Sequence, residues 1–159
     1  MSRKRRHRLQ QKKVAQQKAK PDIIISGPSP ELMLIPEEDV DELWIVAENF
    51  ISAGLEGSEL SEDEAKEQCL DGRAQLWIAW SDHCEAVAMT HLIPTPSGLV
   101  CVLAACGGEN RTRWLGLLEQ IEQWARTEDC KAMRIFGRKG WAKVLHGYRV
   151  ERLILDKEL

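Results

Sequence analysis

A pair of adjacent glycines, Gly107 and Gly108, stands between a strongly apolar run and a long amphipathic run of the chain. Glycines just before a helix let backbone N–H groups approach a phosphate closely, because no side chain blocks the way. The same pair is also typical of a simple turn at the end of a strand. The sequence therefore allows an anion site here and leaves the plain turn open.

A second glycine-rich stretch, Phe136 to Trp141, reads Phe-Gly-Arg-Lys-Gly-Trp. Its two basic residues, Arg138 and Lys139, stand between glycines and beside an aromatic side chain. This arrangement suits a phosphate or the acidic rim of a partner. The alternative is a tight connection between a strand and a helix, with Trp141 anchored in the core.

The side chains able to act as acid, base or nucleophile carry no recognisable motif. Glu85, His83 and His91 are candidate bases by residue type, and Cys106 is a candidate nucleophile. Nothing in the sequence supplies any of them with a partner, so a satisfied or solvated polar residue is the simpler interpretation of each. The sequence alone predicts no catalytic residue.

The first 20 residues form a strongly basic arm. They hold nine Lys or Arg and no acid, whereas residues 21–159 hold 13 basic and 25 acidic residues, a net charge of −12. The arm has too little apolar content to offset its ordering entropy, so we expect disorder. Such charge runs bind nucleic acid without reading its sequence, although a solvated tail is the alternative. The expected contacts with nucleic acid or another polyanion are Arg3, Lys4, Arg5, Arg6, Arg8, Lys12, Lys13, Arg138 and Lys139.

Length and composition predict one globular domain at residues 32–159, after a Pro-rich linker at residues 21–31. The chain has 159 residues, of which 43% are hydrophobic. Its apolar runs are too short for a bilayer and it shows no signal peptide, so we expect a cytoplasmic protein without a membrane partner. Five cysteines without CxxC spacing indicate reduced thiols and no metal site.

The hydrophobic pattern predicts ten elements in the order β-α-α-β-β-β-α-β-α-β, a mixed α/β (α+β) sheet. Gly107 and Gly108 are expected to end the fourth strand, and the sequence Ser61 to Glu64 indicates a capping box. Strands are expected at residues 32–35, 74–80, 85–93, 99–105, 131–136 and 152–155. Helices are expected at residues 36–52, 61–72, 113–127 and 141–146.

This order resembles the GNAT (Gcn5-related N-acetyltransferase) fold over residues 32–159. The resemblance implies that the pyrophosphate of acetyl-CoA would bind on the loop after the central strand. The family pattern there is Arg or Gln, two residues, Gly, one residue, then Gly or Ala. Arg111 and Gly116 match its ends, but Trp114 replaces the middle glycine. The cofactor-binding residues implied by the resemblance are Gly107, Gly108, Arg111, Arg113 and Gly116.

The resemblance also implies an acid that this chain lacks. Many family members use a Tyr, just before a Gly-aromatic step, to protonate the leaving thiolate. Residues 141–146 before Gly147-Tyr148 contain no Tyr. The run Gly137 to Trp141 is similar to a segment of phage-encoded GNAT-like proteins, some of which serve in virions without acetyl transfer.

Together these features predict a catalytically degenerate, phage-type GNAT-like protein without a cofactor. It would act in assembly or as a DNA-associated virion component, in the host cytoplasm or in the virion, with nucleic acid or other virion proteins as partners. The alternatives are an active N-acetyltransferase that uses acetyl-CoA on an unknown amine, and a regulator that binds a CoA-like ligand without chemistry.

Overall fold

The computed structural model describes residues 27–159; the basic arm and most of the linker lie outside the described residues. The described part contains five strands, four α-helical segments and three short 3₁₀ turns (η). In chain order these are β1 (Glu31–Ile35), η1 (Glu37–Asp39), α2 (Val40–Gly54), α3 (Glu62–Leu70), β2 (Gln75–Trp80), β3 (Cys84–Thr95), β4 (Gly98–Gly108), α4 (Arg111–Trp114), η2 (Leu115–Leu117), α5 (Leu118–Thr127), β5 (Ala132–Ile135) and η3 (Lys139–Lys143).

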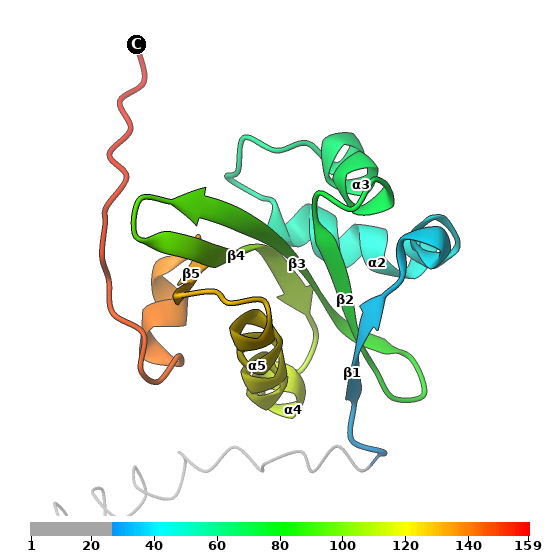
Figure 1. Cartoon of the computed structure of the whole chain (residues 1–159). Coiled ribbons are helices and arrows are strands. Elements are labelled where there is room, and N and C mark those ends of the chain that lie inside the picture. The colour runs from blue at the N-terminus through cyan, green and yellow to red at the C-terminus, as the bar shows by residue number, and fades with distance from the viewer. Residues whose placement is uncertain (1–26) are drawn as a thin grey trace, which may run out of the picture.

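The strands form one sheet in chain order, β1-β2-β3-β4-β5 (Figure 1). The first four strands pair antiparallel with their neighbours, and β5 pairs parallel with β4 after the crossover through α4 and α5. Helices cover both faces of this mixed sheet, which confirms the predicted fold class.

The two faces of the sheet carry separate apolar clusters, because successive side chains of a strand point to opposite faces. Leu76 and Ile78 of β2 belong to the cluster that packs against α2 and α3. Trp77, between them in the sequence, belongs to the cluster on the α5 side with Ile121. The rings of Trp77 and Trp124 of α5 meet in a T-shaped arrangement, with their centroids 5.1 Å apart. The core thus has two layers, one on each side of the sheet.

The predicted capping box at the start of α3 is present. The hydroxyl of Ser61 accepts a hydrogen bond from the N–H of Glu64 at 3.3 Å, and the Glu64 carboxylate accepts one from the N–H of Ser61 at 2.9 Å. Both groups satisfy backbone donors that a helix start otherwise leaves unpaired. The helix expected from residue 36 begins instead as the turn η1 and becomes α2 at Val40.

Two predictions for the middle of the chain are wrong. The strand predicted to stop at Ala105 continues through Gly107 and Gly108, which pair with β3 as the last two residues of β4. The helix predicted at residues 113–127 starts earlier, at Arg111, and is divided into α4, η2 and α5. Gly116, a poor helix former, lies inside the interruption.

Predictions for the end of the chain also need correction. The short helix expected at residues 141–146 is the 3₁₀ turn η3, which begins at Lys139. The strand expected at Arg152–Leu155 is absent, because this segment has no neighbouring strand to pair with in the described chain. Its apolar side chains are exposed instead.

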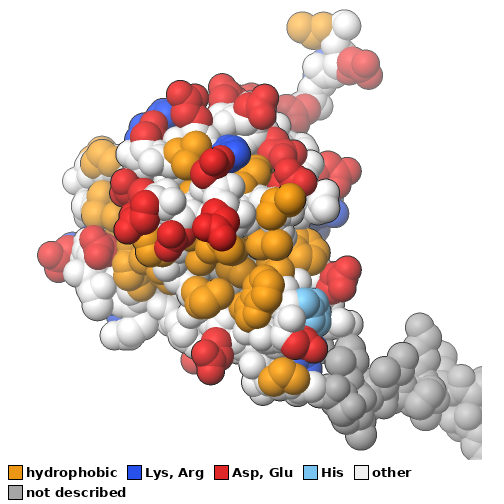
Figure 2. Space-filling model, turned by 90° about the vertical axis from the view of Figure 1, so that its right-hand side faces the viewer, with side chains coloured by type: hydrophobic (Ala, Val, Ile, Leu, Met, Phe, Trp, Pro, Cys, Tyr) orange, Lys and Arg blue, Asp and Glu red, His pale blue; other side chains and the backbone are white. Residues whose placement is uncertain are grey.

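The β1 side of the molecule carries apolar side chains with acidic side chains around them (Figure 2). Met33 and Leu34 of β1 and Trp80 of β2 are among the large hydrophobic residues that are 36–41% exposed. The acidic surroundings agree with the net charge of −12 for residues 21–159. None of the helices within residues 27–159 has the length and apolar character to cross a bilayer.

Candidate functional site

The candidate site lies at the end of the sheet where β4 extends beyond β5. The two strands pair only from Val100↔Ala132 to Leu103↔Ile135, whereas β4 continues to Gly108. The chain then bends at Asn110, whose φ of 49° lies in the left-handed region that Asn tolerates better than most residues. This bend starts α4, which carries Arg111, Arg113 and Trp114.

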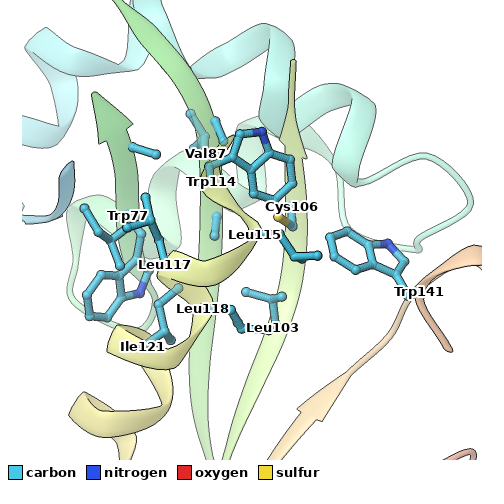
Figure 3. Close-up of a pocket in the computed structure, with 14 residues that line it drawn as sticks. Trp77, Val87, Leu103, Cys106, Trp114, Leu115, Leu117, Leu118, Ile121 and Trp141 are labelled. Atoms are coloured by element: carbon cyan, nitrogen blue, oxygen red, sulfur yellow. The ribbon is translucent and has the colours of Figure 1, made fainter. Parts of the chain in front are cut away.

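Trp114 packs between α4 and the sheet, and Trp141 points toward Cys106 from the other side of β4 (Figure 3). Trp114 of α4 is 8% exposed, and its ring centroid lies 6.4 Å from that of Trp141 in η3. Their rings and the thiol of Cys106 line an apolar pocket whose cavity volume is about 30 Å³. That volume holds about one water molecule. The pocket as it stands in the structure is therefore too small for a substrate.

Trp114 is also fixed by a hydrogen bond. Its indole N–H donates to the backbone carbonyl of Glu109 at 2.6 Å. A buried indole N–H needs such a partner, and this one joins α4 to the end of β4. The interpretation of Trp114 as a core residue agrees with this contact.

Arg113 forms a fork with the carboxylate of Glu85 on β3. Its Nε donates to Oε2 at 2.7 Å and its Nη2 to Oε1 at 2.7 Å, while the Ser81 hydroxyl donates to Oε1 at 2.7 Å. Nη2 also donates to the carbonyl of Pro28 at 2.5 Å. Glu85 is 2% exposed, and its bonds to Arg113 lower its pKa to about 2. Arg113 thus joins β3, α4 and the linker.

The glycines of β4 are explained by close packing. A Cβ on Gly107 would lie 2.3 Å from the carbonyl oxygen of Phe50 in α2. One on Gly108 would lie 2.5 Å from the Cβ of Ala86 and 2.7 Å from the carbonyl oxygen of Glu85. The backbones of α2 and β3 thus require glycine at both positions. Gly116 differs, because a Cβ there would meet nothing within 4 Å.

These residues fit a pyrophosphate poorly. The N–H of Glu109 already donates to Glu85 O at 2.9 Å, and that of Arg113 donates to Asn110 O at 2.8 Å. The α-helical segment α4 has only four residues, so its dipole is small. Arg111 is exposed in its first turn, but Arg113 is bound to Glu85. The assignment of Gly107, Gly108, Arg111, Arg113 and Gly116 to a cofactor stays a prediction.

The candidate nucleophile Cys106 and the hydroxyl of Tyr148 both lie in apolar or closed surroundings. Burial raises the pKa of the Cys106 thiol to about 12. The Tyr148 hydroxyl donates to Glu122 Oε1 of α5 at 2.7 Å, and burial together with this carboxylate raises its pKa above the ordinary value. Tyr148 therefore holds the chain after η3 against α5.

Of the three candidate bases, Glu85 lies in this site, bound to Arg113, and the two histidines lie elsewhere. His83 is exposed in the β2–β3 turn, where Nδ1 is 2.5 Å from the Asp82 carboxylate. His91 Nε2 is 2.7 Å from Gln68 Oε1 on α3, and burial followed by the charge of Arg73 lowers its pKa. Neither histidine is among the residues that line the pocket of Trp114.

The basic turn after β5 has a structural contact of its own. Arg138 pairs with Glu56, just beyond the end of α2, and Lys139 is exposed. A Cβ on Gly137 would lie 2.6 Å from the ring of Trp141, so glycine lets that ring fold back toward the sheet. Seven of the predicted polyanion contacts, from Arg3 to Lys13, lie outside the described residues.

The pairing of Glu85 with Arg113 was not found from the sequence. The two residues are 28 positions apart, and no local motif connects them. One signal was available: Glu85 opens the apolar run Glu-Ala-Val-Ala-Met of a predicted strand. A carboxylate in a buried strand requires a cationic partner, because an unpaired buried charge is strongly unfavourable.

No protein-family model matches the sequence, and no curated protein matches it. Solved structures match the fold. An aminoglycoside acetyltransferase from an uncultured soil metagenomic sample has a TM-score of 0.63 at 8% identity, over 82% of this chain and 95% of that chain. The aminoglycoside N-acetyltransferase AAC(6')-Iy, solved in complex with CoA, has a TM-score of 0.60 at 15% identity, over 86% of this chain and 99% of that chain.

A GNAT family acetyltransferase from Staphylococcus aureus has a TM-score of 0.55 at 16% identity, over 82% of this chain and 99% of that chain. Identities this low establish architecture and not activity. The chain therefore has the GNAT fold that the order of its elements predicted.

Proposed function

We propose that the chain is a binding protein built on a GNAT fold, which does not transfer acetyl groups and binds nucleic acid through its basic arm. The first part of the proposal depends on the end of β4. There Trp114 and Trp141 occupy the space beside the loop at residues 109–116, and Arg113 is bound to Glu85. This arrangement supports a structural role for Arg113 and Trp114, in the loop where a GNAT enzyme would bind the phosphates of its cofactor.

The second part depends on charge. Nine cations in 20 residues precede a body with a net charge of −12, so the arm is the main cationic segment of the chain. The acidic body would repel a polyanion, which favours contacts made by the arm alone. Arg138 is paired with Glu56, so we assign a smaller share to the turn at residues 137–140.

The proposal extends to a role in a phage virion or in its assembly. It is supported by the resemblance of residues 137–141 to phage-encoded GNAT-like proteins and by the arm, which suits contact with packaged DNA. The alternative of an active acetyltransferase is supported by the solved neighbours, which are acetyltransferases. Binding of acetyl-CoA distinguishes the two.

The arm is tested with a labelled DNA duplex and fluorescence anisotropy. Replacing Arg3, Lys4, Arg5, Arg6, Arg8, Lys12 and Lys13 by Gln keeps the arm's length and removes the charges that release counterions. Seven phosphate contacts predict a slope of about −6 for log K against log salt in the natural chain. The substituted chain should bind at least about 100-fold more weakly at low salt.

The control is the pair Arg138→Gln and Lys139→Gln, which should change affinity by less than about 10-fold. Equal DNA affinity of the natural and arm-substituted chains at matched salt would remove the arm from the proposal. A random-sequence duplex should bind as well as any other, since phosphate contacts carry no sequence information.

A further inference from the structure

The linker before β1 packs against the body as far as the structure describes it. Pro30 is buried, and the carbonyl of Pro28 accepts a hydrogen bond from Arg113 Nη2 at 2.5 Å. A Cβ on Gly27 would lie 3.9 Å from the same nitrogen. The chain enters β1 from the end of the sheet at which α4 lies (Figure 1). Residues 27–30 are therefore held beside α4 by contacts of their own.

An apolar surface adjoins this point, because the residue after Arg113 is Trp114. It is the rim of the pocket of Trp114, formed by Leu32 of β1 on one side and by Leu115 and Leu117 of η2 on the other. Leu32 and Leu117 pack against the cluster that contains Trp114, and all three leucines are only half-buried. An apolar rim that stays open to water is typical of a surface that another segment covers.

The segment within reach of this rim is the run Ile23-Ile24-Ile25, which lies outside the described residues. Ile25 is two residues before Gly27, and Ile23 is four residues before it. An extended chain spans about 3.5 Å per residue, so the Cα atoms of the run lie within about 7–14 Å of Gly27. Solvated linkers are poor in large aliphatic residues, and each isoleucine stabilises the fold when apolar contacts remove it from water.

Two features favour this segment over another molecule as the cover of the rim. A short tether gives an effective concentration in the millimolar range, far above that of a second copy or of a different protein. The cations of the arm stop at Lys20, and residues 23–26 contain only isoleucine and serine. The segment would therefore bring no charge into contact with the apolar rim.

We propose that residues 23–26 form a strap across the rim of the pocket of Trp114, between β1 and η2. The isoleucine side chains cover Leu32 and Leu117, and the hydrogen bond between Pro28 and Arg113 fixes the end of the strap. The strap also fixes the root of the basic arm beside α4, so nucleic acid bound by the arm lies at the end of the sheet where β4 extends beyond β5. This consequence rests on the proposed function, whereas the contact itself does not.

The test is the thermal stability of the full-length chain, measured without nucleic acid. The triple change Ile23→Ser, Ile24→Ser and Ile25→Ser should lower the melting temperature by at least about 4 °C, because the contacts with the rim are lost. The control, Leu9→Ser with Val14→Ser, changes two aliphatic residues of the arm in the same way and should leave the melting temperature unchanged.

Hydrogen exchange gives a second measurement on the natural chain. The amides of residues 23–26 should exchange at least about 10-fold more slowly than those of an unstructured peptide with the same sequence. Exchange at the rate of the free peptide would overturn the proposal, and so would a triple variant that melts with the natural chain.

A change on the rim locates the contact. In a chain that carries Leu117→Ala, the triple change should lower the melting temperature by less than half as much, because one partner of the isoleucines is already gone. An equal loss in both backgrounds would overturn the proposal, since the isoleucines would then pack elsewhere. A difference between natural and triple-variant chains that grows with protein concentration would assign the contact to a second copy and overturn it as well.

Discussion

Replacing Glu85 by alanine is expected to destabilise the fold by about 1.5–3 kcal/mol, because it removes the carboxylate that accepts two charge-assisted hydrogen bonds from Arg113. Glu85 is 2% exposed, and the side chain of Arg113 is 17% exposed. The change would also remove one of the two acceptors of the Ser81 hydroxyl. Urea unfolding of the natural and variant chains measures the difference.

The double change Glu85→Leu with Arg113→Met is the matched control. It replaces the ion pair by apolar side chains of similar size and should cost less than the single change, because both charges of the pair are removed together. A cost below about 1 kcal/mol for Glu85→Ala alone would mean that the fork contributes little.

The same pair predicts a dependence on pH. Arg113 holds the pKa of Glu85 at about 2, below the ordinary value of 4.5. A lowered pKa stabilises the folded state fully above the ordinary value, and this contribution is lost as the pH falls from 4.5 toward 2. The Glu85→Leu, Arg113→Met chain should therefore lose less stability than the natural chain over that range.

Replacing Trp114 by alanine is expected to cost about 3–5 kcal/mol, the usual range for a large aromatic residue removed from a core. Trp114 is 8% exposed, packs beside Trp141 and donates to the carbonyl of Glu109. Trp114→Phe should cost less, since it keeps most of the apolar volume and loses the hydrogen bond. Urea unfolding again gives the comparison.

Trp141→Ala is the control for the other half of the pair. Trp141 is only partly buried, so its loss should cost less than that of Trp114. A nearly neutral Trp114→Ala would show that the indole is not a core residue, and the space beside α4 would again be a candidate binding site.

The fold was predictable because its signals are local. The capping box at Ser61, the alternation in β2 and the continuous apolar run of β4 each specify an element by themselves. Their order then leaves few architectures open. The prediction of a final strand at Arg152–Leu155 was wrong for a different reason. The apolar pattern of these residues suits a strand, but a strand also needs a neighbour to pair with, and the local sequence does not show whether one is present.

The candidate site was less predictable, because its determinants are contacts between distant segments. Gly107 and Gly108 suggested a turn or a phosphate loop, whereas the backbones of α2 and β3 are what exclude a side chain there. Arg113 suggested a phosphate ligand, yet its partner Glu85 is on another strand. Trp114 was the exception: its place in the helical pattern already indicated a core residue, and its burial agrees.

Calorimetric titration of residues 21–159 with acetyl-CoA and with CoA tests most directly whether this GNAT fold binds the cofactor. The arm is removed because it would itself attract phosphates. We predict no detectable heat and an unchanged melting temperature at millimolar ligand, since Trp114 and Trp141 fill the space beside α4 and Arg113 is bound to Glu85. Micromolar binding of acetyl-CoA would contradict this account and would favour an active acetyltransferase.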